Sequence, residues 1–579
     1  MNNIFKVKIE QYSFDKEGIL KLRDTCQHGV DWPVVYILSG NKEAYIGETQ
    51  SAYNRMIQHL STKDSLRKNL TRINLIQSEV FNKSAILDIE NMLITHMHAD
   101  GIFILQNANG GQSKLHNYYQ RNMYQDLFGN IWIKLKGLNL AKHNLFEVEN
   151  LDVFKFSPYK KLTNEQYEVV EELLKLYSKA IQQESRIDIV VNGGAGTGKS
   201  LIAIYFINVI ASILNNNYDY SHNENYIDNE SFFSKADFVK SVKKYGNNKI
   251  CFVVAAPSFK NTVKKIFSSI KELRKIKVLS PSEASRGDYD IIIVDEAHRL
   301  KRRNKLTNYG THDSVNKELN LPNYSTELDW MKMKAKKMLI LFYDNKQTVK
   351  ESDVKSEDFE KTILGDKVFQ FFLNTQMRVK GGNEYIDFVN KLFTNTPSMY
   401  YGKNEYDIKV FENCHEMFEE IKKKNLEYNG LCRVLSGLSF YWRKKARDKS
   451  TTNYKQKYDF TIDGYNYCWN VDFNAGDFIT NDDNIDKIGC IYTSQGYDLN
   501  FAGVILGEDI SYNTFTQKIE YHVDRFIDKN AKSDNIDATI NNIINAYKIL
   551  LTRGIYGTYI YAVDKNLRKY IKTLINKNN

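Results

Sequence analysis

The 579-residue sequence predicts an α/β fold built on parallel sheets. Three largely apolar runs, at 187–191, 289–294 and 338–343, each end where polar or glycine residues begin. Such runs are typical of strands that are buried on both faces of a parallel sheet. The first run is followed by a glycine-rich turn and an apolar helix over 201–214, which indicates a strand–turn–helix unit. At this length about three to four domains are expected.

The composition is that of an ordinary soluble protein, with 42% hydrophobic and 26% charged residues. The formal net charge is +10, yet residues 1–112 contain twelve basic and twelve acidic residues, so the excess lies in the remainder. This mild excess is compatible with nucleic-acid binding but does not require it. Six scattered cysteines without metal-binding spacing predict reduced thiols. Because no signal peptide or membrane-spanning run is recognisable, we expect a soluble cytoplasmic protein.

The N-terminal segment begins with two predicted strands and a helix. The strands are expected at 34–39 and 43–48, joined by a turn at Gly40 and Asn41. The helix that follows places Arg55 and His59 four residues apart, on a face next to its apolar stripe.

A second helix is predicted over 84–97, and Glu90 falls within its apolar stripe. The stripe is formed by Ile86, Ile89, Leu93 and Met97. Because a buried carboxylate is unfavourable unless it is paired or binds a metal, Glu90 is a candidate metal ligand. His96 and His98 flank the stripe, and without a third partner we interpret them as structural residues.

These residues resemble the motifs of the GIY-YIG nuclease family. Val34-Val35-Tyr36 stands for the first half-motif and Tyr45-Ile46-Gly47 for the second. Arg55 and Glu90 stand where the family has an arginine and a metal-binding glutamate. The resemblance covers a small α/β domain over residues 1–115, followed by a connector over 116–155.

The resemblance implies hydrolysis of a phosphodiester bond with one divalent cation. Glu90 would hold Mg²⁺ or Mn²⁺, which prefer hard oxygen ligands. Arg55 would stabilise the charge that develops on the phosphate. Tyr36 and Tyr45 would orient or deprotonate the attacking water, a role that His59 would share.

Two features depart from the family pattern. The first glycine and isoleucine are replaced by Val34 and Val35. The closing asparagine is matched by either Asn107 or Asn109, and the sequence does not decide between them.

The glycine-rich turn has the spacing of a phosphate-binding loop and predicts a nucleoside triphosphate site. Successive N–H groups and the start of the next helix would surround the phosphates. Lys199 would reach the β- and γ-phosphates, and the Ser200 hydroxyl would bind Mg²⁺. The loop residues expected to contact ATP are Gly193, Gly194, Ala195, Gly196, Thr197, Gly198, Lys199 and Ser200.

Two segments near the loop carry further expectations. Gln166 precedes a predicted helix about thirty residues before the loop and resembles the Q motif, whose glutamine pairs with adenine. Residues 215–248, rich in Asn, Tyr, Asp and Lys, are expected to form a loop-like insertion.

Asp295 and Glu296 follow a buried strand, at the edge of the sheet where ligands of α/β proteins bind. Asp295 would hold Mg²⁺ and Glu296 would polarise the attacking water, as phosphoryl transfer requires. The basic segment 299–305 comes next, and it is equally compatible with phosphate contacts and with a solvated loop.

Several later motifs resemble those of superfamily-1 helicases. Gln347 resembles the γ-phosphate sensor of motif III, and Arg378 resembles the arginine of motif IV. Ser494-Gln495-Gly496 resembles motif V, in which Gln495 and Gly496 would contact the nucleotide. Arg553 resembles the motif VI arginine at the γ-phosphate.

The order of these motifs and the residues in them most resemble the Schlafen-type helicase-like ATPase domain. The resemblance implies two RecA-like parallel-sheet domains, over 156–355 and 356–579, with an ATP cleft between them. It also implies ATP and Mg²⁺ as cofactors and a nucleic acid as partner, with DNA preferred over RNA.

The leading hypothesis is an ATP-dependent enzyme that combines phosphodiester cleavage with a helicase-like motor. A role in bacterial defence against foreign DNA, including viral DNA, is suggested by analogy of architecture alone. The alternatives are a helicase or translocase whose N-terminal domain binds without cutting, and an ATP-gated nucleic-acid sensor. The sequence leaves strand polarity, cleavage specificity and oligomeric state open.

Overall fold

The computed structural model divides into two compact units, one of residues 1–175 with 204–246 and one of 176–203 with 247–579. It describes residues 6–63, 67–107, 118–182, 186–215, 236–246, 248–306, 308–344, 347–348, 350–363, 368–394, 396–402, 406–441, 458–470, 478–479, 481–494 and 497–575.

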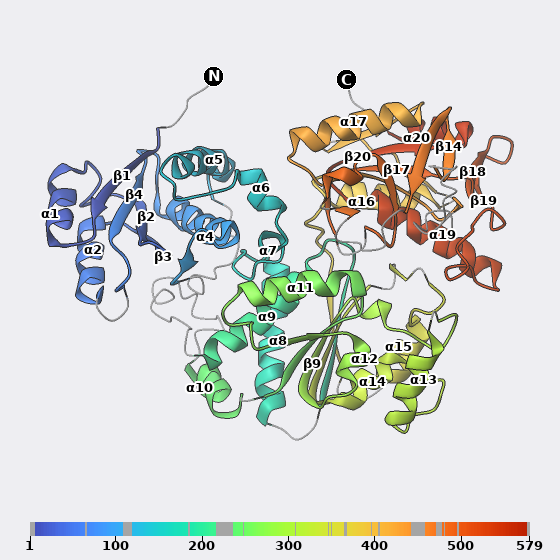
Figure 1. The fold of residues 1–579 in the computed structure, drawn as a ribbon, viewed down its shortest axis with the longest axis horizontal. Coiled ribbons are helices and arrows are strands. Elements are labelled where there is room, and N and C mark those ends of the chain that lie inside the picture. Colours follow the sequence, from blue (N-terminus) through green and yellow to red (C-terminus); the bar gives the residue numbers. More distant parts are fainter. Residues whose placement is uncertain are drawn as a thin grey trace, which may run out of the picture. The chain divides into compact units, whose positions relative to one another are not determined.

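The first unit is built around a mixed sheet with strand order β1-β4-β2-β3-β5 (Figure 1). Its described strands are β1 (Lys8–Ser13), β2 (Val34–Ser39), β3 (Glu43–Thr49), β4 (Arg72–Gln77) and β5 (Ile104–Leu105). Pairing is antiparallel except between β3 and β5, and it sets Tyr36 opposite Gly47. The predicted hairpin is therefore confirmed.

Helices accompany this sheet, and the two at 52–61 and 83–100 match the helices that the sequence predicts. They are α1 (Lys16–Thr25), α2 (Ala52–Ser61), α4 (Lys83–Asp100), α5 (Arg121–Gly137), α6 (Leu145–Asn150) and α7 (Asp152–Lys155). Helix α4 packs on β2 and β3, and its predicted stripe is buried throughout. Helices α5, α6 and α7 pack on α4 and make up most of the described part of the predicted connector 116–155.

Three further helices lie around the phosphate-binding loop in sequence. They are α8 (Asn164–Gln182), α9 (Lys199–Leu214) and α10 (Ala236–Tyr245). Helix α10 corrects the predicted loop-like insertion over 215–248 at residues 236–245, while 216–235 and 247 lie outside the described residues. Its polar surface had hidden an amphipathic pattern, in which Phe238, Val239 and Val242 are buried.

The second unit contains a parallel sheet with strand order β11-β6-β10-β9-β7-β8. Its described strands are β6 (Ile187–Gly193), β7 (Ile250–Val254), β8 (Lys277–Leu279), β9 (Tyr289–Asp295), β10 (Ala335–Tyr343) and β11 (Val368–Leu373). Strand β10 lies between β6 and β9, so the three predicted strands are neighbours. Their C-terminal ends lie at one edge because all three run in the same direction.

Helices flank this sheet (Figure 1). They are α11 (Pro257–Ser269), α12 (Pro281–Ala284), α13 (Tyr309–Glu318), α14 (Glu327–Lys334) and α15 (Ser356–Ile363), with a 3₁₀ turn at Ala297–Arg299. Strand β11 lies beyond the predicted domain boundary at 355/356 yet pairs with β6. The chain therefore leaves the first sheet only after Leu373.

A second sheet in this unit has strand order β12-β20-β17-β13-β16-β15-β14 and is parallel except where β14 meets β15. Its described strands are β12 (Asp407–Val410), β13 (Cys432–Ser436), β14 (Phe460–Ile462), β15 (Tyr465–Trp469), β16 (Lys487–Cys490), β17 (Leu499–Leu506) and β20 (Gly554–Ala562). A separate hairpin is formed by β18 (Ile510–Asn513) and β19 (Lys518–Tyr521).

The helices of this region are α16 (Gly382–Leu392), α17 (Cys414–Glu427), α19 (Ile536–Leu551) and α20 (Lys565–Leu574), with a 3₁₀ turn at Asp482–Asn484. Helix α17 packs on β13, β17 and β20, and α19 packs on β17. The α/β class with parallel sheets is thus confirmed. All six cysteines are free thiols, as predicted. No helix in the described ranges is both long enough and apolar enough to cross a membrane.

Candidate functional site

The predicted phosphate-binding loop connects β6 to α9. Gly196 and Gly198 adopt φ values of 78° and 87°, a region that side-chain-bearing residues rarely enter. The Lys199 ammonium donates to the carbonyl oxygens of Gly193 and Gly194, at 2.7 and 2.9 Å. The loop therefore curls round its own lysine, at the position where the sequence predicts phosphate.

Asp295 lies at the C-terminal end of β9 and is fully buried. The Ser200 hydroxyl donates to its carboxylate, and burial, followed by the charge of Glu296, raises the pKa of Asp295. Its Oδ2 atom has no hydrogen-bond partner among the described residues. A buried acceptor without a donor, next to a hydroxyl, fits the carboxylate and Ser ligands by which proteins hold Mg²⁺ against a phosphate.

That fit rests on one carboxylate and one hydroxyl. Within the described ranges, no cluster of three or more His, Cys, Asp or Glu side chains could hold a metal ion. Nucleotide-bound Mg²⁺ keeps several waters and phosphate oxygens, so it does not need such a cluster.

Glu296 follows directly and has a left-handed backbone, with φ of 54°. This strained conformation is rare outside glycine and is found more often at functional sites. Burial would raise the pKa of Glu296, but the overall direction is downward because of the His298 imidazole, whose Nε2 lies 3.2 Å from the carboxylate. Glu296 is therefore ionised at neutral pH, as a proton acceptor must be.

Asp344 joins two of the predicted residues. It follows β10, accepts a hydrogen bond from the Gln347 side-chain amide at 2.6 Å, and lies 3.8 Å from the Lys199 ammonium. The γ-phosphate sensor predicted at Gln347 is thus connected to the loop lysine through one carboxylate. We had given Asp344 no role, although its position after an apolar strand matches that of Asp295.

The two predicted arginines approach the same region. The Met377 N–H donates to the Gly196 carbonyl oxygen at 2.9 Å, and a Cβ on Gly196 would lie 2.6 Å from that of Arg378. The Arg378 guanidinium forms an ion pair with Asp498 at 2.5 Å. The sequence did not indicate that partner.

Arg553 is buried and donates to the Tyr497 carbonyl oxygen at 3.2 Å. Burial, together with the nearby charge of Arg378, lowers the pKa of Arg553 to about 10, while Asp498 and Glu296 oppose this shift. The Arg553 guanidinium is therefore within electrostatic range of Glu296. Tyr497 is also held by a second hydrogen bond, because its hydroxyl lies 2.9 Å from the hydroxyl of Thr262 in α11.

The remaining ATPase predictions have different outcomes. The Gln166 side chain accepts from the Thr163 N–H at 3.1 Å, and the Thr163 hydroxyl accepts from the Gln166 N–H, so the pair caps α8. Its contact with adenine stays a prediction. Gln495 and Gly496 lie outside the described residues.

The basic segment 299–305 is largely paired with acidic side chains, although Arg303 is exposed. Whether it contacts phosphate stays a prediction. Arg299 and Lys301 both pair with the buried Asp353. Arg302 pairs with Glu351 at 3.2 Å, and Lys305 with Asp534 at 3.0 Å. Most of its charge is thus matched by acidic residues that are distant in sequence.

In the other unit, the predicted aromatic and basic residues lie together on β2, β3 and α2. The Tyr36 hydroxyl is 2.8 Å from His59 Nε2 and accepts from Arg55 Nε at 3.3 Å. The Tyr45 ring stacks beside Tyr36 and meets the edge of His59, with centroids 6.2 and 4.9 Å apart. The structure therefore brings all four residues into one cluster.

Glu90 faces this cluster from α4 and is partly buried. Burial raises the pKa of Glu90 to about 8, and the Glu48 carboxylate adds to the rise, while Lys83, Lys161 and Arg55 oppose it. Glu48 is itself paired with the Lys83 ammonium at 2.6 Å, and a divalent cation beside Glu90 would stabilise the ionised form of Glu90. We had missed Glu48, although it directly follows the Tyr45-Ile46-Gly47 motif.

Two details show why particular residue types are needed here. A Cβ at Gly47 would lie 2.3 Å from the Tyr36 hydroxyl, so a glycine is required opposite that tyrosine. Asn107 accepts from the Ile46 N–H at 3.1 Å and donates to its carbonyl oxygen. Asn107 is thus the asparagine that holds the second half-motif strand, while Asn109 lies outside the described residues.

The two flanking histidines pack as structural residues. His96 lies between the rings of Phe128, Trp132 and Phe154. The ring of His98 meets Tyr159 edge-on at 4.8 Å.

Comparisons with known proteins bear mainly on the second unit. Residues 187–564 match the model of the family described as Schlafen group 3, DNA/RNA helicase domain. An uncharacterized protein of Saccharomyces cerevisiae is 27% identical over 412 residues, which is 66% of this chain and 82% of that protein. A chain from a solved S. cerevisiae structure of a Dbp5 variant bound to Gle1 covers 73% of this chain and 89% of its own length, at 13% identity and a TM-score of 0.28.

Proposed function

The chain belongs to the Schlafen group 3 family of DNA/RNA helicase domains, and we propose that it hydrolyses ATP to move or remodel a nucleic-acid strand. The observation that carries the proposal is the set of side chains at the C-terminal edge of the six-stranded sheet. There Lys199, Asp295, Glu296 and Asp344 converge from β6, β9 and β10.

Each residue has a distinct task in this proposal. The Lys199 ammonium would exchange the loop carbonyl oxygens for phosphate oxygens, because its three N–H groups can donate to either kind of acceptor. Asp295 and Ser200 would hold Mg²⁺, which supplies charge neutralisation at the phosphates when bound. Glu296 would accept the proton of the attacking water.

The arginines would respond to the γ-phosphate. Arg378 would exchange Asp498 for phosphate oxygen, and Arg553 would add a second positive charge. Gln347 would report the phosphate to the chain after β10 through Asp344. Loss of the γ-phosphate would return Arg378 to Asp498, which gives the two nucleotide states different structures.

The test is Glu296→Gln, with the exposed Glu318→Gln as matched control. We expect the variant to bind ATP within about threefold of the parent and to hydrolyse it at least about 100-fold more slowly. Phosphate release should be measured with and without single-stranded DNA, duplex DNA and RNA. ATP hydrolysis in Glu296→Gln equal to that of Glu318→Gln would refute the assignment.

We also propose that the N-terminal site cleaves phosphodiester bonds with a divalent cation. What supports this is the cluster of Tyr36, Tyr45, Arg55 and His59, in which the Tyr36 hydroxyl contacts both His59 and Arg55, and whose electrostatics include Glu90. Glu90 would hold the cation, Arg55 the phosphate, and the Tyr36–His59 pair the attacking water. DNA as the preferred substrate and a role in defence rest on resemblance and analogy alone.

Comparing nucleic-acid cleavage by Glu90→Ala with cleavage by the control variant Glu79→Ala, at an exposed position, tests this second activity. Labelled single-stranded DNA, duplex DNA and RNA should be incubated with Mg²⁺ or Mn²⁺, with and without ATP. We expect cleavage only in the parent and the control. Equal cleavage by Glu90→Ala would refute the nuclease, while no cleavage by any form together with strand-stimulated ATP hydrolysis would identify a translocase whose N-terminal domain only binds.

A further inference from the structure

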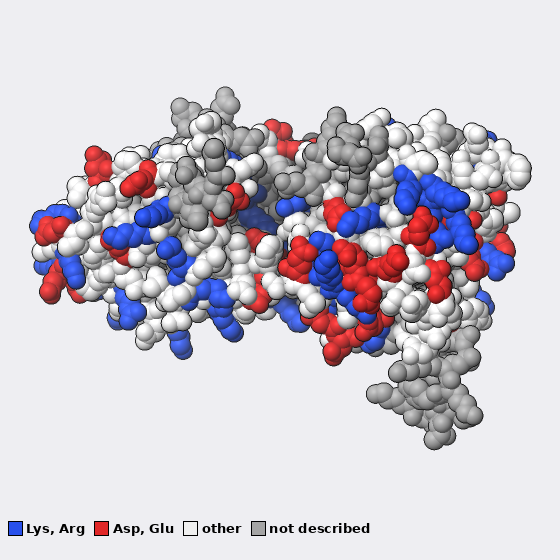
Figure 2. Space-filling view, turned by 90° about the horizontal axis from the view of Figure 1, so that it is seen from above, with Lys and Arg blue, Asp and Glu red and all other residues white. Residues whose placement is uncertain are grey.

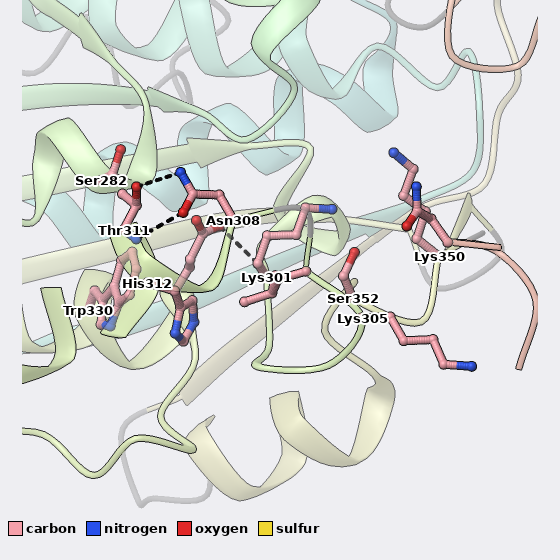
Figure 3. Close-up of a pocket in the computed structure, with 12 residues that line it drawn as sticks. Ser282, Lys301, Lys305, Asn308, Thr311, His312, Trp330, Lys350 and Ser352 are labelled. Atoms are coloured by element: carbon pink, nitrogen blue, oxygen red, sulfur yellow. Dashed lines mark hydrogen bonds between the residues drawn. The ribbon is translucent and has the colours of Figure 1, made fainter. Parts of the chain in front are cut away.

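A cavity of about 320 Å³ lies beside the ATPase residues, at the segments that follow β9 and β10. Lys301 and Lys305 line it from the first segment, and Lys350 and Ser352 from the second (Figure 3). Asn530 contributes from the part of the chain between β19 and α19. The cavity is large enough for about one nucleotide unit by the usual sizes of ligand pockets.

The two ends of the cavity differ chemically. Figure 3 shows Ser282, Thr311, His312 and Trp330 at one end, and the lysines with Ser352 toward the other. The lining contains three lysines and a single carboxylate, Glu327. An excess of ammonium groups around a confined space favours an anion.

Of the three lysines that line the cavity, Lys350 is the one for which no ion pair is found among the described residues. Its ammonium lies 4.0 Å from the Tyr492 ring centroid. By contrast, Lys301 pairs with Asp353 and Lys305 with Asp534. Burial, reinforced by the positive charges of Lys301 and Arg299, lowers the pKa of Lys350 to about 8, although the Asp353 and Asp528 carboxylates oppose this shift. A nearby anion would relieve the repulsion between the Lys301 and Lys350 ammonium groups.

On the face seen in Figure 2, basic and acidic side chains are interspersed rather than gathered in a broad basic stripe. We propose that this cavity holds a backbone phosphate of the single-stranded nucleic acid on which the motor acts, with Lys350 and Lys301 as its contacts. The proposal rests on the motor function proposed above.

The cavity also has a structural connection to the ATPase residues. The buried Asp353 accepts from Lys301, from the Lys350 N–H at 3.2 Å, and from Arg299 at 3.2 Å. The positive charge of Arg299 in turn acts on Glu296 and Arg553. A phosphate that draws Lys301 away from Asp353 would leave that carboxylate to Arg299, and so change the field at Glu296.

The experiment compares Lys350→Gln with Lys336→Gln, a control at the exposed start of β10, and with Lys350→Arg, which keeps the charge. The probe is a fluorescein-labelled 12-nucleotide oligothymidylate, measured by anisotropy over a series of salt concentrations. In Lys350→Gln we expect binding weaker by about fivefold and a log–log salt slope shallower by about 0.7, the loss of one single-strand phosphate contact. Lys350→Arg should keep the parental slope.

Strand-stimulated ATP hydrolysis is the second readout. It should fall in Lys350→Gln, while ATP binding and strand-free hydrolysis match those of Lys336→Gln, which also shows that the variant is folded. A salt slope in Lys350→Gln equal to that of Lys336→Gln would overturn the proposal. So would competition by inorganic phosphate or AMP as strong as by the oligonucleotide, because the cavity would then serve a free anion.

These measurements distinguish a refutation of the motor function from a refutation of this phosphate site. An unchanged slope with intact strand-stimulated hydrolysis removes the site and keeps the motor. The expected slope change in a protein that hydrolyses no ATP would keep the site and remove the motor.

Discussion

Replacing Glu90 by glutamine should make the first unit more stable at high pH than it is in the parent protein. Burial and Glu48 raise the pKa of Glu90 from 4.5 to about 8. An acid whose pKa is higher in the folded state binds its proton more tightly there, so folding is favoured at low pH and loses free energy as pH rises from about 4.5 to about 8. Glutamine is neutral throughout and avoids this loss.

The size of the effect follows from the shift. At about 1.36 kcal/mol per pKa unit, the change corresponds to about 5 kcal/mol above pH 8. Glu90 is partly open to solvent, so we reduce this figure to about 2–3 kcal/mol because of screening. At pH 5, where the parental carboxyl is mostly protonated in the folded state, the two proteins should differ little.

The assay is hydrogen exchange of the amides of α4 at pH 5.5 and pH 8.5, corrected for the intrinsic rates. A local measurement is needed because a chain with several domains has no single unfolding free energy. We expect α4 in Glu90→Gln to be better protected than in the parent at pH 8.5 and equally protected at pH 5.5. Addition of Mg²⁺ at pH 8.5 should protect α4 in the parent and not in the variant.

The exposed Glu79→Gln is the control and should follow the parent at both pH values. If α4 is no better protected in Glu90→Gln than in Glu79→Gln at pH 8.5, ionisation of Glu90 does not destabilise the folded first unit. If Mg²⁺ protects the variant as well as the parent, the cation does not depend on Glu90.

Two further predictions concern single contacts. Asp344→Asn removes the negative charge between Lys199 and Gln347 while keeping a hydrogen-bond acceptor. The kcat for ATP hydrolysis should therefore fall about tenfold with little change in ATP affinity. Steady-state phosphate release measures this, and an unchanged kcat would contradict it. Gly47→Ala forces a methyl group against the Tyr36 hydroxyl and should destabilise β2 and β3 by about 1–3 kcal/mol in hydrogen exchange, whereas Gly129→Ala, which has open space around it, should not. Equal exchange in both alanine variants would show that β2 and β3 separate at no cost.

The strand ends at the proposed ATP site could be predicted because their signals are local. Each of β6, β9 and β10 combines an apolar run with the polar residue that terminates it, and parallel pairing then brings those ends together. Asp344 carried the same signal. The capping role of Gln166 was also readable, since Thr163 three residues earlier completes a capping box.

The remaining features depend on pairs that are far apart in sequence. Nothing near Arg378 indicates Asp498, and nothing near Lys301 indicates Asp353, 52 residues later. Strand β11 is half-exposed at the edge of its sheet, so it lacks the continuous apolar run that marks a central strand. Neither feature could be located until the chain was folded.

The lysine held by its own loop has a consequence for nucleotide selection. Two carbonyl oxygens of the loop accept hydrogen bonds from the Lys199 ammonium, so phosphate binding would exchange acceptors rather than add new ones. A nucleotide that presents no oxygen at the exchange position leaves the lysine where it is. Discrimination between a triphosphate and a shorter nucleotide would then arise from this competition inside the loop.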